Sequence, residues 1–138
     1  GAREMKEKQL PGIVFIMRSS GGAGRELFRS LNSNEQMKSL QDRFVLILTS
    51  EKDEPEGEKW NPGTWNDWIR NVDSKSKYYP RVFFADKDMN IDYDINNAGY
   101  SPSHLFYYYD AESVYKNALR YLSHHQLIDD DPFLEYEL

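Results

Sequence analysis

Short apolar runs and helically spaced apolar residues alternate along the chain, which predicts an alternation of strands and helices. A charged helix over residues 4–10 should stop at Pro11 and Gly12, ahead of an apolar, β-branched run at 13–17. That run predicts a buried strand. The turn after it leads into a predicted helix whose apolar face is formed by Leu27, Phe28 and Leu31.

A second helical stretch and a second strand are predicted next. Ser33 and Gln36 have the spacing of a capping box. Met37 and Leu40 lie on the apolar side of the helical stretch that would follow. Residues 44–49 then form an apolar run that predicts a strand. The order strand, helix, strand favours a parallel pair with a right-handed crossover.

The middle of the chain is polar and rich in residues that break helices. Residues 50–63 contain two prolines and two glycines, so a loop is predicted there. Thr64, with Asp67 three residues later, is then predicted to cap a helix. The apolar residues of this helix recur at helical spacing and are Trp65, Trp68, Ile69 and Val72.

The last third of the chain predicts two strands and a helix. Residues 81–85 and 105–109 read as an antiparallel pair, with a polar turn at 86–90. Asp110 should cap the final helix, which should fray near residues 124–125. The apolar face of that helix is formed by Ala111, Val114, Ala118, Tyr121 and Leu122.

These elements predict an α/β fold with a central mixed β-sheet flanked by helices. A length of 138 residues suits one domain. We therefore expect a single domain over 1–138, with its core at about 4–124. We expect residues 60–77 to form an inserted loop or helix and residues 125–138 to form an acidic tail.

Two motifs carry a family resemblance. Residues 18–27 read R-S-S-G-G-A-G-R-E-L, and residues 78–84 read Y-Y-P-R-V-F-F. They align with K-S-W-C-G-A-C-K-x-L and Y-I-P-R-I-L-F. Over about residues 4–121 the chain resembles the small endoplasmic-reticulum thioredoxin-like proteins, the group of the anterior gradient proteins and thioredoxin domain-containing protein twelve. The resemblance implies a thioredoxin-like fold with a cis-proline, Pro80, before the third strand.

The resemblance also implies where the site lies and how its chemistry has changed. Gly21 and Gly24 stand where the family has its two cysteines, so the degenerate motif is Gly21, Gly22, Ala23 and Gly24. The chain contains no cysteine, and thiol–disulfide exchange needs a thiolate nucleophile. This chain therefore cannot exchange disulfides, whether the cysteines were lost or engineered out.

Peptide contact does not require sulfur. In the family, the residue before the cis-proline offers its backbone to an extended peptide. The implied peptide-binding residues are Ser20, Gly21, Gly24, Tyr79 and Pro80. The glycines could instead expose backbone N–H groups to an anion, but the phosphate-binding fingerprints are incomplete. We favour a turn that kept its shape after losing its chemistry.

Trp65, Trp68 and Ile69, in the inserted segment, form a second candidate interaction site. Helically spaced aromatic residues usually form a local core, whereas exposed ones would mark a binding surface. We favour the core interpretation.

Charge and composition limit the classes of partner that the chain is expected to bind. With 23 acidic and 17 basic residues the net charge is -6, the wrong sign for nucleic-acid binding. The apolar runs are shorter than the roughly 20 residues of a membrane-spanning helix. No nucleic-acid or membrane partner is expected. The pattern of a calcium-binding loop at 86–97 is incomplete. The three histidines are predicted to be solvated; they are His104, His124 and His125. Neither a metal nor a cofactor is therefore expected.

The last four residues are Glu135, Tyr136, Glu137 and Leu138, similar to K-D-E-L retrieval signals. With the resemblance, they favour the endoplasmic reticulum lumen, or secretion. We predict a redox-inactive thioredoxin-like protein that binds client or partner polypeptides non-covalently, rather than an enzyme. The alternatives are an oxidoreductase family member that lost its cysteines and a scaffold subunit that uses the Trp-rich helix.

Overall fold

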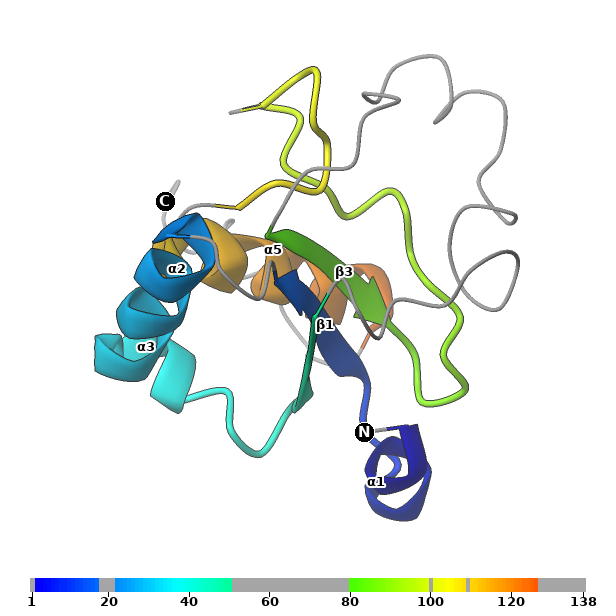
Figure 1. Cartoon of the computed structure of the whole chain (residues 1–138). Coiled ribbons are helices and arrows are strands. Elements are labelled where there is room, and N and C mark those ends of the chain that lie inside the picture. The colour runs from blue at the N-terminus through cyan, green and yellow to red at the C-terminus, as the bar shows by residue number, and fades with distance from the viewer. Residues whose placement is uncertain (1, 18–21, 51–79, 100, 109, 127–138) are drawn as a thin grey trace, which may run out of the picture.

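The protein forms a mixed β-sheet with helices packed against it (Figure 1). The computed structural model describes residues 2–17, 22–50, 80–99, 101–108 and 110–126. Within these ranges β1 (Gly12–Met17) is the central strand. It pairs in parallel with β2 (Val45–Ser50) and antiparallel with β3 (Arg81–Ala85). The predicted α/β class, the central mixed sheet and the parallel β1–β2 pair are confirmed.

β1 suits the centre of the sheet because it is apolar on both faces. Ile13 and Phe15 point to one face, and Val14 and Ile16 point to the other. All four are at most 1 % exposed. Burial on both faces fixes the register of a strand, since a shift of one residue would exchange the two sets of side chains.

Three helices cover the Ile13 and Phe15 face of the sheet. α2 (Gly22–Ser33) and α3 (Glu35–Lys38) connect β1 to β2. α5 (Ala111–His124) crosses behind β1 and β3 in Figure 1. The helical residues of this core include Leu27, Leu31, Met37, Val114, Ala118, Tyr121 and Leu122.

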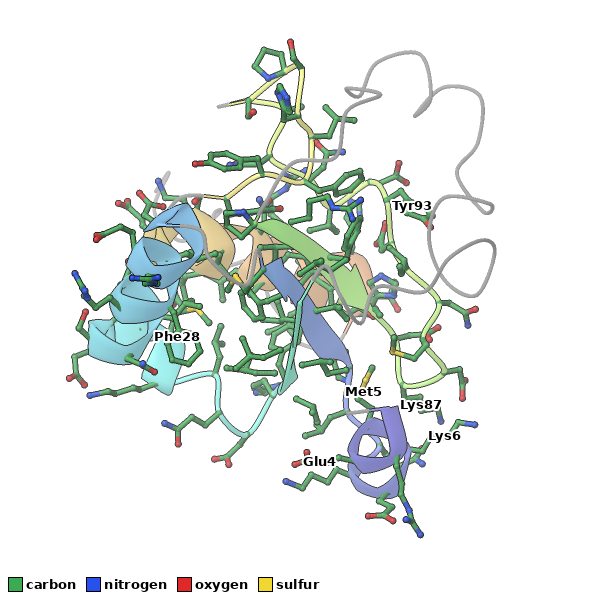
Figure 2. The ribbon with its side chains drawn as sticks, viewed as in Figure 1. Glu4, Met5, Lys6, Phe28, Lys87 and Tyr93 are labelled. Atoms are coloured by element: carbon green, nitrogen blue, oxygen red, sulfur yellow. The ribbon has the colours of Figure 1, made fainter. Side chains whose placement is uncertain are left out.

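The opposite face is covered by α1 (Ala2–Lys8) and by irregular chain. Met5 of α1 is fully buried against Val45 and Ala85, and Figure 2 shows it on the side of α1 that faces the sheet. A Cβ atom on Gly12 would lie 2.7 Å from the Met5 Sδ. Glycine at the start of β1 therefore leaves the space that Met5 occupies.

Two predicted boundaries move by one or two residues. The helix expected at 4–10 ends at Lys8, because Gln9 adopts a left-handed backbone with φ 58°. The cap of α3 is Asn34 rather than Ser33, and its side chain accepts a hydrogen bond from the Met37 N–H at 2.9 Å. Ser33 is still helical and is the last residue of α2.

The strand predicted at 105–109 is wrong for the residues that the structure describes there, 105–108. A single isolated bridge joins Tyr107 to β3. The backbone carbonyls of Leu105 and Tyr107 accept hydrogen bonds from Asn97, at 2.6 and 2.9 Å. The Tyr107 N–H donates to the His104 carbonyl at 3.1 Å. Residues 104–107 therefore form a turn, and the extended segment is too short for a continuous β-ladder with β3.

The predicted turn after β3 and the predicted cap of α5 are confirmed. The Asp86 carboxylate accepts hydrogen bonds from the backbone N–H groups of Asp88 and Asn90, each at 2.9 Å. Asp110 accepts one from the Ser113 N–H at 2.9 Å. The described helices are too short or too polar to cross a bilayer.

Candidate functional site

Two parts of the chain that are distant in sequence meet at one end of the sheet. β1 ends at Met17, and α2 begins at Gly22. The antiparallel register pairs Ile16 with Arg81, so the next position along each strand brings Met17 level with Pro80. Pro80 is buried. The end of β1, the first turn of α2 and the residue before β3 thus form one site, which we call the Gly24–Pro80 site.

Gly24 holds the first turn of α2 close to the end of β1. It is buried, and a Cβ atom there would lie 3.3 Å from the Met17 Sδ. Gly22 is exposed, with nothing within 4 Å of its would-be Cβ. The helix therefore packs against β1 at Gly24 and opens to solvent at Gly22. Backbone N–H groups in the first turn of a helix have no partner inside the helix.

The structure brings together some of the predicted site residues. Gly22 and Gly24 lie in the first helical turn rather than in a loop, and Pro80 lies at the same end of the sheet. The backbone of Ala23 is part of α2. The other candidates lie outside the described residues; they are Ser20, Gly21, Tyr79, Trp65, Trp68, Ile69, Glu135, Tyr136, Glu137 and Leu138.

Arg81 is a buried cation that the sequence analysis did not single out. It follows Pro80, opens β3 and is only 4 % exposed. Burial lowers the pKa of its guanidinium to about 10, and the guanidinium carbon lies 6.0 Å from the centre of the Phe83 ring. The sequence signal was one basic residue at the start of an apolar strand. Phe83 belongs to the face of the sheet opposite α2, so the Arg81 guanidinium adds positive charge on that opposite face rather than beside Gly24.

The described part of the Gly24–Pro80 site contains no side-chain nucleophile. Met17, Gly22, Gly24 and Pro80 carry neither an acidic nor a basic side chain, and the whole chain lacks cysteine. What remains is main-chain hydrogen bonding and apolar contact. Such a set suits binding of an extended backbone rather than covalent chemistry.

His125 lies in a second cluster of titratable groups, where α5 meets the chain after β3. Its Nε2 is 2.8 Å from the Asp92 Oδ2, and its ring stacks on Tyr121 at 4.1 Å. His124 Nδ1 is 4.0 Å from the same oxygen. The sequence predicted a solvated side chain for His125. The side chain is exposed, as expected, and it also pairs with Asp92. In the described ranges no three His, Cys, Asp or Glu side chains are grouped so as to hold a metal ion.

A depression of about 200 Å³, lined mainly by residues with polar side chains, lies between α5 and residues 96–99. Its amide groups are engaged within the protein. The Asn117 Nδ2 donates to the Tyr108 hydroxyl at 2.9 Å, and Arg120 donates to the Asn117 Oδ1 at 2.8 Å. Burial raises the pKa of Tyr108, so its hydroxyl stays protonated. This network ties α5 to the chain before it.

A search of the sequence against models of known protein families finds no match. The interpretation of the Gly24–Pro80 site therefore depends on its geometry and on the motifs in the sequence.

Proposed function

We propose that the chain is a redox-inactive protein of thioredoxin-like fold, with Pro80 in the cis form, that binds extended polypeptides non-covalently at the Gly24–Pro80 site. The observation that supports it is the packing of Gly24 on Met17 beside Pro80, in a chain without cysteine. In this arrangement a helix N-terminus lies next to the end of a strand. That supports binding of a peptide backbone without a thiol.

The proposed binding is weak. Proline has no backbone N–H, so binding at this end relies on N–H groups of the first turn of α2 and on main-chain groups next to Pro80. A few such hydrogen bonds, each worth about 1 kcal/mol net, correspond to a dissociation constant in the millimolar to micromolar range. Clients would exchange rapidly rather than be trapped by a mixed disulfide.

A peptide titration followed by NMR tests the site. A ten-residue peptide without cysteine should shift the amide signals of Met17, Gly22, Gly24 and Arg81. Pro80→Ala should weaken binding about fivefold, the equivalent of about 1 kcal/mol. Lys38→Ala, at an exposed position of α3, is the matched control and should bind as the parent does. Shifts confined to residues 65–69 would instead identify the inserted segment as the interaction site.

A cysteine pair tests the thioredoxin-like register. In the double variant Gly21→Cys and Gly24→Cys, the two thiols stand at the spacing of the family motif and should form an intramolecular disulfide under mild oxidation. The control pair Gly22→Cys and Gly24→Cys points to different sides of the helix and should stay reduced. If the first pair also stays reduced, the proposed register is wrong.

We also propose that residues 135–138 act as a retrieval signal for the endoplasmic reticulum lumen, supported by their similarity to K-D-E-L. Such signals are read at a free C-terminus. Two residues added after Leu138 should therefore move the protein, expressed with a secretory leader, into the medium. The same two residues added before Gly1 should leave it in the cell. Equal retention of both forms would contradict the proposal.

A further inference from the structure

Three large apolar side chains are exposed in the part of the chain that the structure describes. Leu46 and Leu48 of β2 are 50 % and 52 % exposed, and Phe28 of α2 is 41 % exposed. Single exposed apolar residues are common on protein surfaces. Two of these three, however, alternate along one strand, so they belong to the same face of the sheet.

All three lie on the helical side of the sheet. The parallel register pairs Leu46 with Ile13 and Leu48 with Phe15, so these leucines point to the face that α2, α3 and α5 cover. Figure 2 labels Phe28 on the same helical layer. The layer buries Ile13 and Phe15 but leaves about half of each leucine in water.

β2 is also an edge strand within the described ranges. It pairs with β1 on one side, and no described strand pairs with its other side. Natural edge strands are usually protected by charged residues, proline, bulges or covering loops. The residues of β2 are Val-Leu-Ile-Leu-Thr-Ser and include neither a charge nor a proline. Among the described residues, a regular strand with an apolar face therefore presents its outer backbone edge to a further strand.

We propose that the outer edge of β2 binds an extended, apolar polypeptide segment as an additional strand, with Leu46 and Leu48 contacting alternate side chains of that segment. Main-chain hydrogen bonds to the edge would give affinity, and the two leucines would select apolar residues at every second position. Because β2 carries no charge, selection depends on this alternation rather than on charge. The proposal uses different residues from the Gly24–Pro80 site and does not depend on it.

The exposed apolar area favours a peptide over a second copy of the chain. About half of three large side chains amounts to roughly 300 Å². A stable protein–protein interface buries about 800 Å² on each partner. A single added strand needs much less side-chain surface, because the ladder of backbone hydrogen bonds supplies part of the affinity.

The test uses the neutral peptide acetyl-KVTVTVE-amide and NMR titration of the whole chain. The peptide should shift the amide signals of residues 45–48. The double variant Leu46→Lys and Leu48→Lys should bind it at least tenfold more weakly. Asn32→Lys with Gln36→Lys adds the same charge at exposed positions of α2 and α3 and should bind as the parent does. All four substituted positions are at least half exposed or polar, so both variants should fold.

A second peptide separates backbone pairing from apolar contact. The same sequence with an N-methyl group on each of its seven residues has no backbone N–H on either edge of the extended chain and should not bind. Three results would overturn the proposal: equal binding of the methylated peptide, shifts confined to Met17 and Arg81, or concentration-dependent dimerisation by sedimentation that the Leu46 and Leu48 substitutions abolish. The last result would identify a second copy as the occupant.

Discussion

β2 and β3 flank the same central strand and are similarly apolar in sequence, yet they differ in burial. All five residues of β3 are buried, including Arg81. In β2, Val45 is buried, while Leu46 and Leu48 are half exposed. β3 has α5 on one face and the Leu105–Phe106 segment on the other. Apolar composition therefore allows a strand to be buried, but the elements packed against it decide whether it is.

Truncation of one large side chain in each strand should give the largest difference. Phe84 is fully buried and contacts the rings of Phe44 and Tyr121, with centroids 6.2 and 6.0 Å away. Phe84→Ala should reduce the free energy of unfolding by about 3–5 kcal/mol, and Leu48→Ala by about 1 kcal/mol or less. Urea denaturation measures both. Equal losses would mean that β2 is covered in solution.

Two glycines test how tightly α1 and α2 pack on β1. At Gly12 a new Cβ would lie 2.7 and 2.8 Å from Met5 Sδ and Cε, inside a buried cluster that includes Val45 and Ala85. Gly12→Ala should therefore cost about 1–3 kcal/mol. At Gly24 the Cβ would be 3.3 Å from the Met17 Sδ, which can shift, and alanine favours the helix. Gly24→Ala should thus change stability by less than about 1 kcal/mol.

Thermal and urea unfolding of the two alanine variants side by side provide this comparison. A large loss for Gly24→Ala together with a small loss for Gly12→Ala would show that the first turn of α2, rather than α1, is the tightly packed contact of β1.

Asp86, in the turn after β3, should make a smaller and pH-dependent contribution to the free energy of unfolding. Partial burial of Asp86 would raise its pKa, but hydrogen bonds from the Asn90 backbone and side chain and the Asp88 backbone, with the nearby His125, lower it below the usual range. The folded state thus binds this proton less tightly than the unfolded state. The resulting stabilisation is present above the unfolded pKa of about 4 and is lost as the pH falls through the folded pKa.

Asp86→Ala should accordingly cost about 1–2 kcal/mol at pH 7 and much less at pH 2–3. Urea denaturation at the two pH values, with Asp88→Ala as the control for an exposed aspartate in the same turn, measures the difference. A cost that does not change with pH would show that the carboxylate charge does not hold the end of β3.

Local sequence signals were sufficient for most of the described elements but not for every strand and cap. The apolar runs predicted the three strands, and helical spacing with a cap at Asp110 predicted α5. The strand at 105–109 failed because the Tyr107 N–H donates to the His104 carbonyl and closes a turn over 104–107. Ser33 failed as a cap because the helix before it continues for one more residue. Both errors come from competition for hydrogen bonds, which periodicity does not measure.

The candidate site was located in part from the sequence. The motifs pointed to Gly24 and Pro80, which lie at the same end of the sheet. They did not reveal the burial of Arg81 or the exposure of Leu46 and Leu48. Both depend on which distant elements cover each strand, and apolar runs of the same composition carry no signal for that.

The strand order has a consequence for synthesis of the protein. A chain made from its N-terminus completes β1, α2, α3 and β2 once residue 50 has emerged, whereas β3 and α5 follow only after residues 85 and 124. During that interval the nascent chain has two open sheet edges, one on β1 and one on β2, and its helical core lacks α5. Sequence-distant pairing delays burial and leaves such species open to aggregation. The arrival of β3 closes the edge of β1, and bridges to Tyr107 and Ile91 cover part of the outer edge of β3. Among the described residues, no such bridge covers the outer edge of β2.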